Sequence, residues 1–157
     1  MIISARPAER SDLAVLAELA GLMTQELREL RGGVVWANTA ARQEPLADRF
    51  ESEIDDANAT LVVGTIDGVP VGFSAARTTQ CHDETAIARI SDLYVMPAAR
   101  KVGVGEALIG AIEAWARQVG LVGLDSFALP GDRHTKNFFE SFGLVARSID
   151  VYRPIEP

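Results

Sequence analysis

Two glycines and two adjacent cations stand at the start of a long amphipathic segment. The stretch MPAARKVGVGEALIGAIEAWARQVG covers residues 96–120 and places Arg100 and Lys101 ahead of Gly103 and Gly105. Glycine costs a helix about 1 kcal/mol relative to alanine, so two glycines near a helix start need another reason. The unpaired N–H groups of a helix N-terminus favour an anion, and glycine lets it approach without a Cβ in the way. The spacing favours an anion-binding loop; a tight turn with solvated cations is the alternative.

Two common nucleotide-binding motifs do not fit this loop. The dinucleotide fingerprint G-x-G-x-x-G needs a third glycine where the chain has Leu108, and it needs a parallel strand–helix–strand unit. The phosphate loop G-x-x-x-x-G-K-[ST] is absent from the sequence. A nucleotide-dependent enzyme is therefore disfavoured.

One polar stretch carries potential metal ligands. Cys81, His82, Asp83 and Glu84 are contiguous, and four contiguous residues cannot converge tetrahedrally on one ion. We therefore expect a polar loop and no metal site. Cys81 is the sole cysteine, which fits a reducing compartment.

Length and composition predict a single domain over residues 1–157. Hydrophobic residues make up 48% of the chain, which is enough to bury a core. The formal net charge of -7 repels nucleic acid phosphates. No apolar run approaches the roughly 18 residues of a membrane span, and the first residues lack signal-peptide features. We expect a cytoplasmic protein with no nucleic-acid and no membrane partner.

The first half of the chain changes from helical to strand periodicity. A short strand over residues 1–8 precedes a helix from Ser11 to about Leu30, where apolar residues recur every three or four positions. The paired glycines of residues 31–40 predict a loop, and residues 43–56 predict a second helix.

Three strand-like runs follow. Residues 59–79 hold two β-type runs separated by Asp67 and Gly68, a strong hairpin signal. Residues 85–95 alternate and are rich in β-branched and aromatic types, so they can pair antiparallel with the second run.

The second half returns to helical periodicity over residues 104–119, with Gly120 as the expected C-cap. A short strand over 121–129, a helix over 135–142 and a final strand over 145–155 complete the predicted order.

Two of these segments resemble motifs of the GCN5-related N-acetyltransferase (GNAT) superfamily. DLYVMPAARKVGVGEALI, residues 92–109, looks like the acetyl-CoA motif, in which a [Q/R]-x-x-G-x-[G/A] loop follows a strand ending in V-x-P. FFESFGL, residues 138–144, is similar to the family's FYExxGF helix and lies one strand later. The order of elements matches over nearly the whole chain. The resemblance implies an α/β (α+β) fold with a mixed, mostly antiparallel sheet of about six to seven strands and about four flanking helices.

The resemblance also implies an acetyl-CoA-dependent N-acetyltransferase in which a neutral primary amine attacks the thioester directly. The pantetheine arm would pair with the strand that ends the meander, and a backbone N–H near its end would polarise the thioester carbonyl. The pyrophosphate would lie on the loop amides, and Asn137 (or Lys136) and the residue at the motif position 139 would line the cofactor. The cofactor residues carried over are Leu93, Tyr94, Val95, Arg100, Lys101, Val102, Gly103, Val104, Gly105, Asn137 and Phe139.

The catalytic residues follow the family less closely. Aligning ISDLYV with the family's IEDLYV puts Ser91 where a Glu often stands and retains Asp92. Asp92 is therefore the first candidate for the base or amine anchor and Glu84 the second, while a structural carboxylate is the alternative for Asp92. The family's usual general acid is the Tyr of FYE, whereas Phe139 has no proton to give.

The acceptor stays open at this level between a small-molecule and a peptide amine. Trp36 either lines the acceptor pocket or packs in the core, and His134 is either a base or a surface histidine. Because family members are often dimers, a homodimer is among the expected states. An acyl-CoA-binding sensor or structural relative without turnover, which Phe139 permits, is the competing function.

Overall fold

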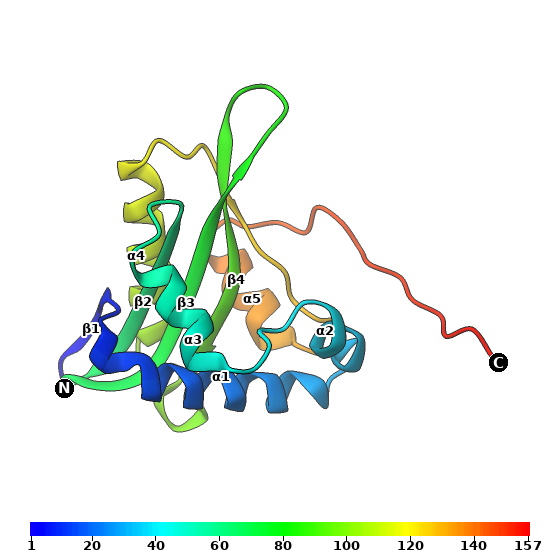
Figure 1. The fold of residues 1–157 in the computed structure, drawn as a ribbon, viewed down its shortest axis with the longest axis horizontal. Coiled ribbons are helices and arrows are strands. Elements are labelled where there is room, and N and C mark those ends of the chain that lie inside the picture. Colours follow the sequence, from blue (N-terminus) through cyan, green and yellow to red (C-terminus); the bar gives the residue numbers. More distant parts are fainter.

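Five strands form one sheet in the order β1-β2-β3-β4-β5 in the computed structural model, which describes residues 1–157 (Figure 1). The first four strands are antiparallel neighbours, and β5 runs parallel to β4. The strands are β1 (Ile3–Pro7), β2 (Ala59–Ile66), β3 (Val69–Gln80), β4 (Ala86–Val95) and β5 (Leu124–Asp125).

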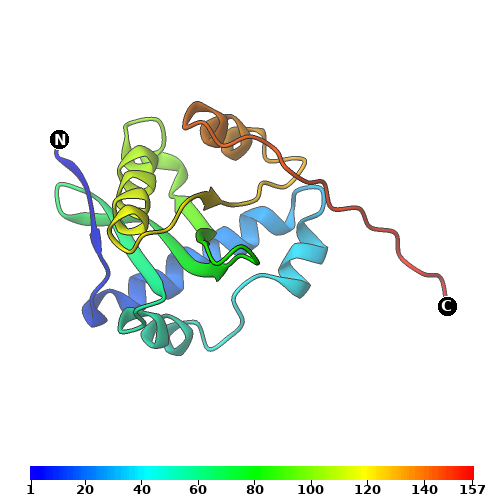
Figure 2. The ribbon, with the colours of Figure 1, turned by 90° about the horizontal axis from the view of Figure 1, so that it is seen from above.

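Five α-helices cover the two faces of this sheet. One face carries α1 to α3 and the other carries α4 and α5, as the view from above shows (Figure 2). Short 3-10 turns at Arg10–Asp12 and Pro97–Ala99 precede α1 and α4. The helices are α1 (Leu13–Arg28), α2 (Gly33–Thr39), α3 (Leu46–Ile54), α4 (Val104–Gln118) and α5 (Arg133–Ser141).

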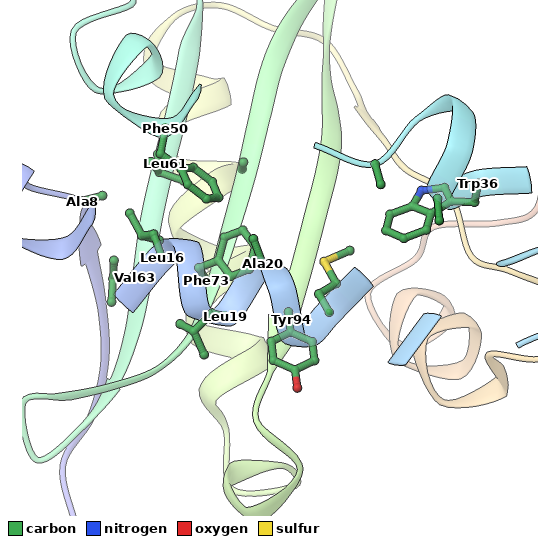
Figure 3. Close-up of a cluster of buried hydrophobic side chains, with 14 residues drawn as sticks. Ala8, Leu16, Leu19, Ala20, Trp36, Phe50, Leu61, Val63, Phe73 and Tyr94 are labelled. Atoms are coloured by element: carbon green, nitrogen blue, oxygen red, sulfur yellow. The ribbon is translucent and has the colours of Figure 1, made fainter. Parts of the chain in front are cut away.

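Each face of the sheet has its own core. On the α1 side, 14 buried residues from α1 to α3 and the sheet pack together, with Phe50 edge-on to Phe73 (Figure 3). On the α4 side, a second cluster packs Val104, Leu108 and Phe139 against the sheet. We refer to these as the α1-side core and the α4-side core.

A bulge in β4 changes which face its residues point to. The pairing with β3 shifts between Ala75 and Ala76, so that Ser91 is passed over. Before the bulge, Ile90 belongs to the α4-side core; after it, Tyr94 belongs to the α1-side core. Asp92, two residues before Tyr94, therefore lies on the α1 side.

Most of the predicted elements are confirmed. The β2–β3 hairpin turns at Asp67 and Gly68, both with positive φ. The predicted helix over 104–119 is α4, and Gly120, with φ of 80°, follows its C-cap Val119.

Three predictions were wrong. The predicted loop 31–40 contains α2, because Gly33 fits against the end of α1 and Trp36 is buried in the α1-side core. The predicted strand 121–129 shortens to Leu124–Asp125. The predicted strand 145–155 pairs with no strand of the chain. The sheet therefore has five strands rather than six to seven, and there are five helices rather than about four.

No helix is both long and apolar enough to cross a membrane. No cluster of three or more His, Cys, Asp or Glu side chains could hold a metal ion.

Candidate functional site

The loop ahead of α4 presents a run of free backbone donors. Lys101 and Gly103 take positive φ values of 66° and 105°, and α4 begins at Val104 without a side-chain cap. The N–H groups of residues 101–106 donate to no acceptor in the chain. Six consecutive amides therefore stand at the positive end of a 15-residue helix, which is an arrangement that binds an anion.

The two cations of this loop have different environments. Arg100 donates from Nη2 to Glu26 at 2.8 Å and from Nε to the carbonyl of Val95 at 2.8 Å. Its guanidinium lies 5.5 Å from the ring centroid of Tyr94, and the hydrogen bond to Glu26 raises the pKa of Arg100. Lys101 is exposed and has no ion-pair partner. The side chain of Arg100 is therefore held against the end of β4 by its own hydrogen bonds. Lys101 carries a positive charge that no acid of the chain neutralises.

The two glycines of the loop act in different ways. Gly103 is in the left-handed region, and a Cβ there would meet only the side chain of Ile3 at 3.6 Å. A Cβ on Gly105 would lie 3.1 Å from the ring of Phe138. Gly103 thus makes the turn, whereas Gly105 lets α5 approach the first turn of α4. The FFESFGL segment and the glycine loop are joined by this contact.

The end of β4 nearest the loop is paired on one edge only. The parallel ladder with β5 stops after two pairs, Ala88 with Leu124 and Arg89 with Asp125. The stretch 92–95 pairs with β3 alone, so its other edge has no strand partner. The predicted cofactor residues Leu93, Tyr94 and Val95 lie in this stretch, directly before the loop.

Asp92 is buried in an ionic network on the α1 side. Its carboxylate accepts from Arg42 Nη2 at 2.9 Å and from Arg42 Nε at 3.3 Å, and it is 2.6 Å from the hydroxyl of Ser91. Arg42 also donates to Glu53 and lies 4.3 Å from the ring centroid of Phe50. Only 6% of Asp92 is exposed, so its carboxylate is a fixed part of the fold.

This network contains one more acid than base. Burial lowers the pKa of Arg42, but the charges of Asp92 and Glu53 outweigh burial and raise it. With Arg42 positive and two carboxylates, the network sums to one negative charge. It lines a hollow of about 320 Å³. Two further arginines in the wall pair with acids: Arg77 pairs with Asp56, and Arg89 pairs with Asp125, which Arg147 shares.

Trp36 belongs to the α1-side core and also borders the hollow. It is buried in the α1-side core and stacks on Phe127 with a centroid distance of 6.0 Å. It also contributes to the wall of the hollow. An aromatic wall and an adjacent negative charge are features that receive an organic cation.

The other predicted site residues are dispersed. Glu84 is exposed in the β3–β4 turn and lines a different hollow, so the structure does not bring it to Asp92. Phe139 is 7% exposed and belongs to the α4-side core. Asn137 and His134 are exposed on α5. Asp132, which stands where the family's motif has Asn, caps α5 by accepting from the Thr135 N–H at 3.2 Å.

Sequence reasoning missed Arg42 and Glu53. Arg42 lies 50 residues before Asp92 in the connection between α2 and α3, and Glu53 lies in α3. Neither has a local motif, and only the packing of α3 on the sheet brings them together.

Comparisons with known proteins place these features in a family. A sequence model of the Acetyltransferase (GNAT) family matches residues 23–144. The chain is 28% identical over 120 residues to an aminoglycoside N(6')-acetyltransferase type 1 of Stenotrophomonas maltophilia, covering 73% of this chain and 78% of that protein.

Solved structures share the fold. A tetramutant of the BH1408 protein of Bacillus halodurans superposes with a TM-score of 0.81 at 20% identity, over 99% of this chain and 100% of that chain. The structure of AAC(6')-Iy in complex with the bisubstrate analog CoA-S-monomethyl-acetylneamine has a TM-score of 0.75 at 18% identity, over 99% of both chains.

Proposed function

The chain belongs to the acetyltransferase (GNAT) family, and from this premise we propose that it transfers the acetyl group of acetyl-CoA to a primary amine of a small cationic acceptor. The observation that carries the proposal is the row of six free amides beside the one-sided end of β4. These two features are adjacent in the chain, and together they suit a ligand with an anionic group and an extended arm.

The residues of the loop fit the cofactor that the family uses. The amides of residues 101–106 would hold the pyrophosphate, Gly103 would let it approach, and Lys101 would add charge. The free edge of β4 from Asp92 to Val95 would hydrogen-bond the pantetheine arm as an added strand does. Bound acetyl-CoA supplies the thioester that is the acetyl donor.

The acceptor is proposed from the charge of the hollow. The Arg42–Glu53–Asp92 network leaves one negative charge beside Trp36, and this favours an ammonium group over an anion. Two relatives are named aminoglycoside N(6')-acetyltransferases, and an aminoglycoside is an amino sugar with several cationic groups. We therefore propose an aminoglycoside or a polyamine of similar charge as the acceptor class.

Asp92 serves this proposal as an amine anchor. Both of its oxygens already accept hydrogen bonds from Arg42, so its position is fixed. We propose that it draws the ammonium to the thioester while solvent takes the ammonium proton. The amine nitrogen would then form the bond to the acetyl carbon and the carbon–sulfur bond would break. The second proton of the nitrogen would pass through solvent to the leaving thiolate, since position 139 is a buried Phe and offers no tyrosine donor.

The test is a turnover assay with acetyl-CoA and a panel of amines. Free thiol release is followed with aminoglycosides such as sisomicin, with polyamines, and with peptides that carry a free N-terminus. Release that saturates with an aminoglycoside or polyamine supports the proposal. Tight coenzyme A binding in calorimetry, without release above background for any amine, would identify a binding protein instead.

A further inference from the structure

The last turn of α1 reaches the start of the glycine loop through an ion pair. Glu26 lies in that turn, and its Oε2 accepts a hydrogen bond from Nη2 of Arg100 at 2.8 Å, across 74 positions of the sequence. It is the sole ion pair that α1 makes, and the side chains of Arg100 and Glu26 are 35% and 40% exposed. No sequence motif joins the two residues, so the contact is a product of tertiary packing.

The guanidinium of Arg100 is held from three directions. Its Nη2 binds Glu26, its Nε donates to the carbonyl of Val95 at 2.8 Å, and it lies 5.5 Å from the ring centroid of Tyr94. Tyr94 is buried in the α1-side core, with its hydroxyl directed away from the other labelled side chains (Figure 3). Burial, followed by the charge of Glu26, raises the pKa of Tyr94, so this hydroxyl stays neutral. Because a guanidinium is planar and donates in fixed directions, Arg100 ties α1, the end of β4 and the start of the loop together.

The loop that follows Arg100 has few contacts of its own to hold it. Lys101 takes a φ of 66°, which is uncommon for a residue with a Cβ, and α4 begins without a side-chain cap. The N–H groups of residues 101–106 donate to no acceptor in the chain. The direction of these amides therefore depends on how the two ends of the loop are fixed. The body of α4 fixes one end, and Arg100 fixes the other.

We propose that Glu26 is a positioning residue of the cofactor loop and acts through Arg100. The pair sets the position of the first loop amides relative to the end of β4. The pyrophosphate and the arm of coenzyme A would have to contact these two parts of the chain at once. This inference rests on the cofactor site proposed above and adds to it a residue of α1.

The opposite role for Glu26 makes the opposite prediction. If Glu26 only withheld Arg100 from the phosphates of the cofactor, removing its charge would free a cation and tighten binding. If Glu26 holds Arg100 in place, removing its charge lets the loop move and weakens binding. The structure favours the second role. The guanidinium contacts Tyr94 of the α1-side core, whereas the first residue of α4, Val104, packs in the α4-side core.

Calorimetry with coenzyme A measures the sign of this effect. Glu26→Gln keeps the shape of the side chain and removes its charge. The Kd of coenzyme A should rise about three- to tenfold, which is the loss expected from one partly exposed, charge-assisted contact. Glu18→Gln is the matched control, because Glu18 is exposed on the same helix and makes no ion pair. Its Kd should equal that of the wild type.

Two further readouts separate positioning from a general loss of stability. In Glu26→Gln, the KM for acetyl-CoA should rise by the same factor as the Kd, while kcat at saturating acetyl-CoA stays unchanged. Its denaturant midpoint should shift no more than that of Glu18→Gln. The double variant Glu26→Gln/Arg100→Gln should bind coenzyme A as Arg100→Gln alone does, because Glu26 acts through Arg100.

The outcomes distinguish the role of Glu26 from the cofactor site itself. Unchanged or tighter binding in Glu26→Gln, or a double variant that binds more weakly than Arg100→Gln, would overturn the role of Glu26 and leave the cofactor site in place. A wild type that does not bind coenzyme A would overturn the cofactor site and this inference with it. If the wild type binds coenzyme A without turnover, the calorimetric comparison still decides the role of Glu26.

Discussion

The glycine loop and the hollow beside Asp92, which we propose as the cofactor and acceptor sites, use different parts of the chain. The loop is contiguous, and its binding groups are backbone amides of residues 101–106. The hollow is assembled from side chains far apart in sequence, with Arg42, Glu53 and Asp92 brought together by the packing of α3 on the sheet. A site made of backbone amides depends on local conformation, so a motif in the sequence can reveal it. A site made of side chains from distant segments depends on tertiary contacts, so no local motif reveals it.

The largest expected effect comes from breaking the backbone site. Gly103→Val puts a branched side chain at φ of 105°, so the loop must rearrange and its amides turn away from the ligand. Hydrogen bonds to a charged group are worth about 1.5–3 kcal/mol each, so losing two of them should weaken coenzyme A binding at least about 100-fold in calorimetry.

Gly120→Val is the matched control for this change. Gly120 also has a positive φ, at the other end of α4, and a Cβ there would meet nothing within 4 Å. Both variants carry the same kind of backbone strain, and only the first should lose the cofactor. Equal affinities in the two variants would remove the loop from the site.

A smaller effect is expected from the side-chain site. Asp92→Asn removes the net negative charge of the network and leaves Arg42 with Glu53 alone. Losing one charged anchor should lower kcat/KM for the amine about 10–100-fold, while the Kd of coenzyme A stays within twofold.

Asp55→Asn provides the comparison for Asp92. It makes the same chemical change in an exposed pair with Arg10, and neither residue of that pair lines the hollow. Its kcat/KM should stay near that of the wild type. If Asp92→Asn retained full activity across pH, Asp92 would be a structural carboxylate only.

The same contrast explains what the sequence could and could not predict. The β2–β3 hairpin and α4 were predictable because Asp67-Gly68 and Gly120 are local signals. The loop 31–40 was predicted without its helix because the burial of Trp36, a tertiary effect, overrides the glycines. Residues 145–155 were predicted as a strand, but a local pattern cannot say which edge of a sheet a strand joins, or whether it joins one. The role of Arg42 could not be predicted from the sequence for the same reason, because tertiary packing sets its partners.

Phe139 stands at the tyrosine position of the family motif, but its side chain packs in the α4-side core. Phe139→Tyr tests which of these two facts determines its role. The side chain is nearly buried among apolar residues of the α4-side core, so an added hydroxyl without a partner should cost about 1–3 kcal/mol of unfolding free energy. Thiol release should not increase. Phe142→Tyr, at the exposed C-cap of α5, should leave stability unchanged in denaturant titration. Faster turnover in Phe139→Tyr would show that the motif position reaches the leaving thiolate.

The smallest effect concerns acid stability on the α1 side. The hydrogen bond from Arg6 lowers the pKa of Asp12 below its ordinary 3.8, so this carboxylate stabilises the fold fully above that value and loses its contribution as the pH falls through the lower folded-state value. In Asp12→Asn, the unfolding free energy should fall less steeply below about pH 4 than in the wild type. Arg6→Gln should likewise make the fall of the unfolding free energy less steep below about pH 4. A slope equal to that of the wild type in both variants would contradict the pairing of Arg6 with Asp12.

The bulge at Ser91 divides β4 into two halves with opposite patterns of side-chain direction. On either side of it, odd and even positions exchange faces, so Arg89, Ser91 and Asp92 all reach the acceptor hollow while Ile90 stays in the opposite core. A mutational library for new acceptors can therefore vary positions 89 and 91 without disturbing the packing beneath the cofactor loop. Deleting Ser91 would remove the extra residue, so the strand would alternate regularly, with Ile90 and Asp92 still on their present faces.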